Sequence, residues 1–336
     1  MKTLFKCLAL VSLILAGNPW PVRASNPAPE KLSDGVIIPI NDTFLKVEVF
    51  ADNVVRVASA RDRAFFARST PVTEVRRKEK TRWKLDTRDG VATLSTAKLQ
   101  VRVNLATGAV AFIDAGGKPI LAEKTGGRTL TPAGVQGEQT FHVRQQWEPN
   151  AGESLYGLGQ RQIGVLDIKG YDLDLWQHNT HVVVPFLVSS RGYGVLWDNL
   201  SFTRFGDLRE FIPIPADCLV DVSNQHGGLT AGTFSAAQPD RLNDAHATNE
   251  ISFISTNRTS VWHRWEGGIV APATGDYQFK AYSNGRIKMW LDGKVVIDHW
   301  RQGWLTDNDQ IKVRLEAGQH YALKLEYGGD EATTMQ

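Results

Sequence analysis

From Gly35 onward the sequence alternates between apolar and polar residues at every second position, with glycine or Asp-Gly breaks between the runs. The run from Leu99 to Leu105 is typical, because aliphatic residues occupy the odd positions and polar residues the even ones. A repeat of two places one set of side chains on a core face and the other on a solvent face of a β-strand. No amphipathic helical segment of useful length interrupts this pattern. The sequence therefore predicts an all-β protein.

The first 24 residues have the pattern of a secretory signal peptide. Lys2 and Lys6 precede an apolar run from Cys7 to Ala16, and small residues lead up to a cleavage site between Ala24 and Ser25. The apolar run is too short to span a bilayer, and no cysteine follows it at a position suited to a lipid anchor. We therefore expect the mature protein to be secreted or periplasmic.

Cleavage of this leader changes the charge and the cysteine content of the chain. The full chain has 38 basic and 36 acidic residues, and loss of Lys2, Lys6 and Arg23 leaves 35 basic residues, so the formal net charge becomes −1. A chain so close to neutrality is not expected to bind nucleic acid or an anionic membrane. Cys218 then remains as the single cysteine, so we predict no internal disulfide, no cysteine-rich metal site and no cofactor.

The stretch from Ser154 to Asn199 combines glycine turns, a polar aromatic loop and two apolar segments. Gly157 and Gly159 flank Leu158. Because glycine has no side chain, the backbone can bend there or approach another segment where a side chain would clash. Residues Val182 to Val188 and Val195 to Trp197 are rich in β-branched and aromatic residues and bounded by turn formers. These two segments are predicted to be buried strands.

Just before the first of these segments the chain carries a run of hydrogen-bonding groups and one large ring. The residues that we expect to contact a substrate are Trp176, Gln177, His178, Asn179 and Thr180. An indole face covers the apolar C–H patches of a sugar, while amides, imidazoles and hydroxyls exchange hydrogen bonds with its hydroxyl groups. In the alternative interpretation, the indole belongs to the core and the amides cap strand ends. The sequence leaves both open.

Four strings in this region, LYGLGQ, QHNT, VPFLVSS and GYGVLWDN, resemble the N-terminal β-sandwich of glycoside hydrolase family 31, the α-glucosidases and α-xylosidases. The resemblance extends from about Gly35 to Asp221. It implies a galactose-mutarotase-like sandwich that precedes a (β/α)8 barrel and contributes a loop to the mouth of the barrel's active site. Gln160 replaces the acidic residue of many members, and the loop from Gln177 to His181 lacks an aspartate that many carry. The resemblance therefore leaves the bound sugar open.

The composition changes near Asn224, and later strings resemble the PA-14 module, a β-sandwich often attached to glycosidases. The matching strings are the run from Trp265 to Phe279, WLDGKVVID and LEAGQHYALKLEY. We predict a signal peptide over residues 1–24, a first sandwich over 25–226 and a PA-14-type module over 227–336 that is incomplete at its C-terminal end. Calcium-binding PA-14 members use adjacent aspartates in a loop, and no such pair occurs here, so we predict no metal.

The resemblance also bears on where catalysis takes place. Retaining glycosidases need two carboxyl groups about 5 Å apart, and family 31 carries its pair on the barrel, which takes about 250 residues. The chain ends at Gln336, so we expect it to be truncated before the barrel. Asp172 and Asp174 would share a strand face, but a solvated loop explains them equally well. His178 and His181 are spaced for a metal only on a helix. We therefore predict no catalytic residue in this chain.

These patterns lead to a primary hypothesis and an alternative. In the first, the chain is the N-terminal part of a secreted α-glycosidase, an α-xylosidase more than an α-glucosidase, acting on xyloglucan-type oligosaccharides or α-glucans. This portion would shape the cleft and bind carbohydrate. In the alternative, the chain is a free-standing carbohydrate-binding or adhesion protein. A weaker third interpretation, a sugar mutarotase, lacks a convincing acid–base pair. Whether the reading frame continues past Gln336 separates the first two.

Overall fold

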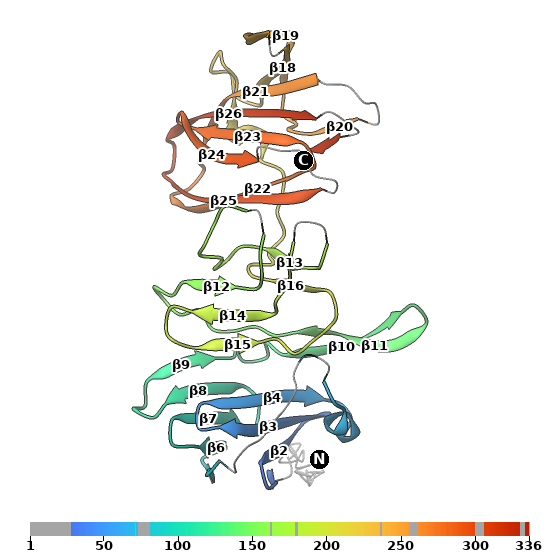
Figure 1. Ribbon diagram of the computed structural model, residues 1–336. Coiled ribbons are helices and arrows are strands. Elements are labelled where there is room, and N and C mark those ends of the chain that lie inside the picture. The colour runs from blue at the N-terminus through green and yellow to red at the C-terminus, as the bar shows by residue number, and fades with distance from the viewer. Residues whose placement is uncertain are drawn as a thin grey trace, which may run out of the picture. The chain divides into compact units, whose positions relative to one another are not determined.

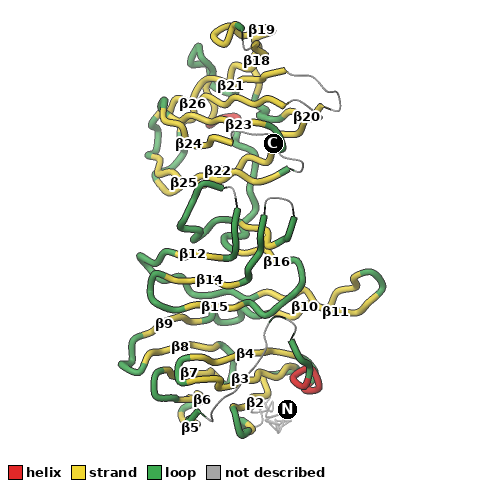
Figure 2. Tube along the Cα trace, in the orientation of Figure 1, coloured by secondary structure: helices red, strands yellow, loops and turns green. Residues whose placement is uncertain are grey.

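The computed structural model describes residues 28–336 apart from 71, 73–80, 162, 179–180, 236, 256–260, 300–305, 330–332 and 336. The chain divides into two compact units, Met1–Glu153 and Ser154–Gln336. Strands dominate both (Figures 1 and 2), and the described helices are two 3-10 turns, η1 (Arg63–Ala67) and η2 (Ala216–Cys218). Neither has the length or hydropathy to cross a membrane. The predicted all-β class is confirmed, whereas the predicted signal peptide lies outside the described residues.

The first unit consists of antiparallel strands. They are β1 (Glu30–Lys31), β2 (Gly35–Ile40), β3 (Thr43–Ala51), β4 (Val54–Ala60), β5 (Lys84–Arg88), β6 (Val91–Ser95), β7 (Leu99–Asn104), β8 (Val110–Asp114), β9 (Pro119–Ala122), β10 (Thr129–Val135) and β11 (Glu138–Arg144). One sheet has the order β1-β2-β3-β4, a second has the order β5-β6-β7-β8-β9, and β10 and β11 form a separate hairpin.

The core of this unit lies between its two main sheets. Leu45 and Val47 on β3 and Val101 and Val103 on β7 belong to one buried cluster, and the intervening Arg102 on β7 is exposed. Each such aliphatic side chain contributes about 1.5–3 kcal/mol through removal of its surface from water. The two-residue alternation predicted for these segments is confirmed.

The second unit contains the remaining strands. They are β12 (Leu155–Gly157), β13 (Leu173–Leu175), β14 (Phe186–Ser189), β15 (Gly194–Leu196), β16 (Thr203–Phe205), β17 (Leu219–Val220), β18 (Leu229–Ser235), β19 (Gln238–Thr248), β20 (Phe253–Ser255), β21 (Val261–Val270), β22 (Gly275–Ser283), β23 (Arg286–Leu291), β24 (Lys294–His299), β25 (Asp307–Leu315), β26 (His320–Gly329) and β27 (Thr333–Met335). Two small sheets, β12-β14-β15 and β13-β16, precede a sandwich. Its larger sheet has the order β19-β18-β21-β26-β23-β24 with β17 on β21, and its smaller sheet has the order β20-β27-β22-β25.

The core of this sandwich contains Leu229, Trp265, Ile287 and Tyr327 among its buried side chains. The predicted Asp-Gly hairpin joins β23 to β24, and both residues of its turn have positive φ, as a type I′ turn requires. Strand β17 joins the larger sheet ahead of the predicted boundary between residues 226 and 227. The boundary itself stays a prediction.

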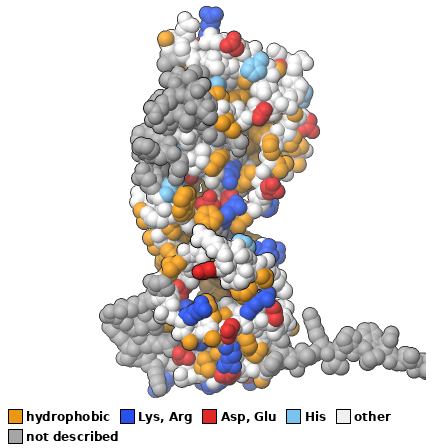
Figure 3. Space-filling model, turned by 90° about the vertical axis from the view of Figure 1, so that its right-hand side faces the viewer, with side chains coloured by type: hydrophobic (Ala, Val, Ile, Leu, Met, Phe, Trp, Pro, Cys, Tyr) orange, Lys and Arg blue, Asp and Glu red, His pale blue; other side chains and the backbone are white. Residues whose placement is uncertain are grey.

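The prediction of a buried strand from Val182 to Val188 is wrong. Strand β14 begins only at Phe186, because Pro185 has no N–H to complete the ladder. Val182 is 47% exposed and Val184 50% exposed. The second segment forms strand β15, which ends at Leu196 and leaves that side chain exposed. Hydrophobic side chains are accordingly visible at the surface (Figure 3). The alternation of apolar and polar residues predicts which side chains share one face of a strand. It does not predict whether another part of the protein covers that face.

The expected close backbone approach at the glycine pair is confirmed. Gly157, Leu158 and Gly159 all have positive φ, at 95°, 62° and 99°. A Cβ atom built on Gly159 would lie 1.9 Å from the carbonyl oxygen of Val182, and one on Gly157 would lie 2.5 Å from that of Phe186. Only a residue without a side chain fits these two positions.

We predict that Gly159→Ala destabilises the second unit strongly. The alanine methyl group would have to displace the chain at Val182 as well as adopt a left-handed backbone, so we expect a loss of about 3 kcal/mol or more. Gly192→Ala is the matched control, since Gly192 has φ of 83° with no atom within 4 Å of the added Cβ, and its cost should be about 1 kcal/mol. Urea unfolding followed by fluorescence measures both. Equal losses for the two variants would contradict the steric explanation.

Candidate functional site

The loop after β13 presents a row of three aromatic rings. Trp176 is 53% exposed, and its ring lies 4.9 Å from that of His178 at an interplanar angle of 35°. The His178 ring lies 4.2 Å from that of His181 at 47°, because a turn brings the two histidines together through the His181 N–H and the His178 carbonyl. The Trp176 indole is therefore an exposed group and not a core residue, and it lies against the His178 ring, which in turn lies against His181.

An aspartate from the sandwich anchors the inner end of this row. The Nε2 atom of the buried His181 lies 2.9 Å from Oδ2 of Asp307, the first residue of β25. Burial alone would raise the pKa of Asp307, but the hydrogen bonds from His181 and the Asn308 N–H, together with the charges of His181 and His178, outweigh it and lower the pKa. The ring row is thus tied to a carboxylate that favours its ionised form.

The side-chain amide of Gln177 is used within the loop itself. Its Nε2 group donates to the carbonyl of His181 over 2.9 Å, and its Oε1 accepts the N–H of Val183 over 3.0 Å. The capping interpretation therefore describes Gln177. Asn179 and Thr180 lie outside the described residues, so the structure brings together Trp176, Gln177 and His178 of the predicted set. Their contact with a substrate stays a prediction.

A half-buried guanidinium, that of Arg161, lies next to this loop. Arg161 donates to the carbonyls of Leu158 and Asp174 over 3.0 and 3.2 Å. Burial lowers the pKa of Arg161, while the nearby carboxylates of Asp307 and Asp174 act in the opposite direction. Chemically, the loop offers an indole face and an imidazole, with the Arg161 guanidinium and the carboxylates of Asp174 and Asp307 nearby. Such groups can bind and orient a hydroxylated ligand.

Behind this loop, Asp172 joins the segment that carries it to the sandwich. The side chain is 3% exposed, and its Oδ2 lies 2.6 Å from Nη2 of Arg204 and 3.2 Å from Nζ of Lys280. Its Oδ1 is buried and has no hydrogen-bond partner within the described part of the chain. Arg204 belongs to β16 and Lys280 to β22, so one carboxylate bridges two sheets of the unit.

Two glutamines reinforce the same junction. Gln310 on β25 accepts the N–H of Asp172 over 3.0 Å and donates to its carbonyl over 2.6 Å. Gln278 on β22 donates to Gln310 over 2.9 Å and to the Gly170 carbonyl over 3.2 Å. Backbone groups that would otherwise be buried without partners are satisfied by side chains of the sandwich. The junction therefore has a defined register and cannot slide freely.

Asp172 and Asp174 do share a face, as predicted, because both approach Arg204, the second at 3.6 Å. The Asp172 carboxylate lies between two cations, and the backbone of the same residue is paired with Gln310, so Asp172 has a structural role. The absence of a catalytic residue from this chain stays a prediction. Among the residues the structure describes, no group of three His, Cys, Asp or Glu side chains is arranged to hold a metal ion. The absence of a metal and of a cofactor remains a prediction.

Several of these residues were not identified from the sequence as part of the site. Asp307 and Gln310 are far from the loop in sequence, and each sits in a strand whose alternation predicts only which face it occupies. Arg161 follows the glycine turn without a motif of its own. Asp307 and Gln310 reach the site only because β25 lies beside the loop segment in the folded protein.

Comparison with known proteins gives two family matches. Residues 44–205 match the model described as the glycosyl hydrolase 31 N-terminal galactose mutarotase-like domain, and residues 226–336 match the PA14 domain. Among curated proteins, the α-xylosidase of Saccharolobus solfataricus is 30% identical over 171 residues, which are 48% of this chain and 23% of that protein. An uncharacterized family 31 glucosidase of Pseudescherichia vulneris is 45% identical over 82 residues, 24% of this chain and 15% of that protein.

A solved structure extends the likeness over most of the chain. The crystal structure of the GH31 α-xylosidase from Xanthomonas citri aligns with a TM-score of 0.71 and 31% identity, covering 91% of this chain and 35% of that one. The chain thus spans about a quarter of the curated α-xylosidase and about a third of the solved one. The predicted succession of a mutarotase-like sandwich and a PA-14-type sandwich is confirmed.

We predict that Asp172→Ala destabilises the second unit by about 3 kcal/mol, because it leaves the largely buried Lys280 ammonium and the half-exposed Arg204 guanidinium without their shared carboxylate. Asp174→Ala is the matched control, since its carboxylate is half exposed and more distant from Arg204, and it should cost less than about 0.5 kcal/mol. Chemical denaturation measures both losses. A near-neutral Asp172→Ala would show that the junction does not depend on this ion pair.

The lowered pKa of Asp307 leads to a prediction of how the free energy of unfolding depends on pH. A carboxyl whose folded pKa is depressed stabilises the fold above its unfolded pKa of about 3.9 and loses that contribution as the pH falls through the folded pKa. We expect Asp307→Asn to cost about 1 kcal/mol at neutral pH, and this cost should shrink below about pH 4. Urea unfolding from pH 3 to 7 tests this expectation, with Asp276→Asn as an exposed control. A cost that is independent of pH would contradict it.

Proposed function

Because the chain carries the N-terminal galactose mutarotase-like domain of glycosyl hydrolase family 31 followed by a PA14 domain, we propose that it is the N-terminal portion of a secreted α-glycosidase. The enzyme would hydrolyse terminal α-linked sugars of oligosaccharides, with α-xylosidase activity favoured over α-glucosidase activity. The observation that carries this proposal is the likeness to a GH31 α-xylosidase over 91% of the chain, both sandwiches included. Xyloglucan-type oligosaccharides or α-glucans are the proposed substrates.

In this proposal the hydrolytic step takes place outside the present chain. Retaining glycosidases work with a nucleophile and an acid–base carboxyl about 5 Å apart. The carboxylates considered for such a pair, Asp172 and Asp174, converge instead on Arg204. The reactive acids would belong to a (β/α)8 barrel in the same polypeptide. The chain alone is therefore proposed to be inactive.

The contribution of this portion is substrate binding. The exposed Trp176 ring would cover the C–H face of a sugar, and His178, next to it, would exchange hydrogen bonds with hydroxyl groups. The anchoring of the row at Asp307 means that the PA14 domain would set the position of a loop contributed by the other domain. Preorganised aromatic surfaces of this kind lose little conformational entropy on binding.

Secretion or a periplasmic location is part of the proposal and rests on the leader pattern of residues 1–24. A free-standing carbohydrate-binding or adhesion protein remains the second candidate. It is favoured by one observation: the exposed Trp176 ring, which lies against His178, is a surface that can cover the face of a sugar without any catalytic group. A stop codon directly after the Gln336 codon in the gene would decide for this second candidate.

We predict that the chain by itself releases no xylose or glucose from aryl α-glycosides, whereas the extended protein, meaning this chain together with the barrel, does. In the extended protein, Trp176→Ala and Asn179→Ala should each raise the KM for oligosaccharides about tenfold, the loss of one stacking or hydrogen-bond contact. The melting temperature should stay nearly unchanged. Turnover by the purified chain would contradict the location of the chemistry, and unfolding of the Asn179 variant would favour a structural role for the loop.

A further inference from the structure

Strands β10 and β11 form a hairpin that stands apart from the other strands of the first unit. Figure 1 shows the hairpin extending away from the two main sheets of that unit. Its pairing runs from Thr129 and Arg144 to Val135 and Glu138, and the two strands form a sheet of their own. Every residue of β11 is exposed. Because a two-stranded hairpin is only marginally stable in water, a further strand beside it would make a more stable sheet.

The outer edge of β11 lacks the residues that usually protect an edge strand. Residues 138–144 include no proline, glycine or lysine, and their pairing with β10 has no shift of register. On β10, by contrast, Pro132 has no backbone N–H and Gly134 has no side chain. Proline, lysine and bulges are common means of preventing an edge strand from pairing with another chain. The edge of the hairpin that is open to pairing is therefore that of β11.

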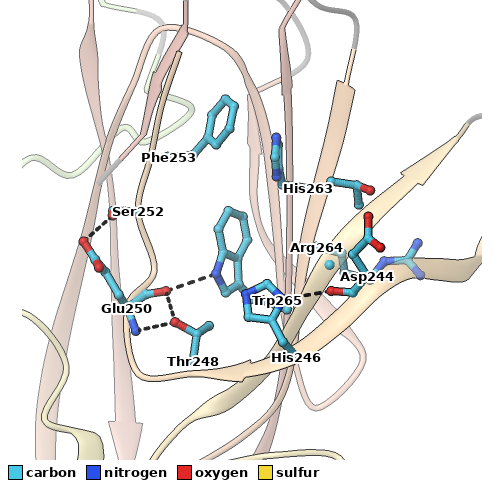
Figure 4. A pocket seen from close by; sticks show the side chains of 12 residues that line it. Asp244, His246, Thr248, Glu250, Ser252, Phe253, His263, Arg264 and Trp265 are labelled. Carbon is cyan, nitrogen blue, oxygen red and sulfur yellow. Dashed lines mark hydrogen bonds between the residues drawn. The ribbon is translucent and has the colours of Figure 1, made fainter.

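The edge strand of the second sandwich, β19, is protected in these ways. It contains Pro239, and its register against β18 shifts twice. At Asp244 the backbone has a φ of 53°, and Nδ1 of His246 lies 2.8 Å from the Asp244 carbonyl oxygen, so the imidazole turns back onto its own strand (Figure 4). Such irregularities hinder regular pairing with a further strand. The regular, exposed edge of β11 differs from β19 in each respect.

The sequence of β11 is complementary to itself. When two copies of the strand run antiparallel with Phe141 opposite Phe141, Glu138 of each copy lies opposite Arg144 of the other. A shift of this pairing by two residues in either direction separates the two charges. Opposite charges placed directly across two strands stabilise a sheet, and so do aromatic pairs. The other opposed pairs are Gln139 with Val143 and Thr140 with His142.

Neither charge meets an opposite charge across the hairpin itself. Glu138 lies opposite Val135, and Arg144 lies opposite Thr129. Both charged side chains are exposed. Pairing with a second copy would therefore bring each of them to an opposite charge without breaking an ion pair between β10 and β11.

The apolar face of the hairpin supports the same pairing. Phe141 lies opposite Pro132, and Val143 lies opposite Leu130, so these four side chains share one face. Phe141 is 39% exposed and Val143 is 45% exposed, although the Arg61 guanidinium lies over the Phe141 ring at 5.3 Å. Two β11 strands centred on Phe141 would place the two phenyl rings side by side. Aromatic pairs are favourable beyond the area that they bury.

We propose that β11 is a dimerisation edge that pairs antiparallel with β11 of a second copy of this chain. The two hairpins form a continuous sheet in the order β10-β11-β11-β10, with a twofold axis at Phe141. The same surface is used on both copies, as in other twofold dimers. Main-chain hydrogen bonds along β11 supply affinity, and the two Glu138–Arg144 pairs fix the register. This inference does not depend on the enzymatic function proposed above.

Analytical ultracentrifugation of the purified protein measures this association. One added strand makes a small interface, so we expect a dissociation constant on the order of 10 to 100 µM. Glu138→Arg and Arg144→Glu should each weaken the dimer about tenfold, because both symmetric pairs then carry like charges. The double variant Glu138→Arg/Arg144→Glu exchanges the charges and should restore the dissociation constant of the unaltered protein.

Lys118→Glu is the matched control, because it reverses one exposed charge of the same unit in the turn between β8 and β9. It should associate as the unaltered protein does. Thermal unfolding checks that each variant is folded. Hydrogen–deuterium exchange gives a second measurement, since alternate N–H groups of β11 point away from β10 and should exchange more slowly at high protein concentration.

The outcomes decide between a second copy and other occupants of the edge. A protein that stays monomeric at concentrations well above this range overturns the inference. A dimer overturns it as well when the two single reversals leave it unchanged, when Lys118→Glu weakens it equally, or when the double variant fails to restore it. Slow exchange of β11 in a monomer would show that another segment of the same polypeptide covers the edge, which also overturns the inference. Loss in both single variants with recovery in the double variant supports it.

Discussion

A single buried carboxylate, that of Asp172, fixes how the loop-bearing segment meets the sandwich in the second unit. It is shared by Arg204 on one side and Lys280 on the other, while Gln310 pairs with both backbone groups of the same residue. Burial of the Asp172 carboxylate is costly unless cations match it, and of its two partners Lys280 is largely buried while Arg204 stays half exposed. The main effect of these contacts is therefore on geometry and not on stability. They fix the position of the β13-β16 sheet relative to the sheet that contains β22, which are not joined by backbone hydrogen bonds between strands.

The aromatic row depends on this register. His181 reaches Asp307 only because β25 lies beside the loop, and Gln310 on the same strand is what holds that segment in place. A shift of β25 by one residue would turn both side chains to the opposite face. The exposed Trp176 ring is thus positioned through contacts with a domain that is distant in sequence. Residues 226–336, which match the PA14 model, therefore help to position this loop.

Much of the fold was predictable because it depends on local pattern. Alternation identified β3 and β7, and Asp292-Gly293 identified the hairpin between β23 and β24. The error at Val182–Val188 arose because composition indicates apolar strands, whereas burial depends on what lies over them. Trp176 and His178 were named as substrate contacts from their chemistry alone, and that role stays a prediction. The contact between His181 and Asp307 could not be predicted, because it results from the packing of β25 beside the loop, which no short motif records.

The turn at Gly157 and Gly159 has a consequence for how such sequences are interpreted. Its two glycines are required by carbonyl oxygens of the neighbouring segment that leave no room for a methyl group. The LYGLG string is consequently a signature of the path of the main chain, and the steric requirement at its glycines does not depend on any bound ligand. The string therefore indicates the fold of the backbone and gives no information on ligand preference. Ligand preference depends on the side chains that the turn positions.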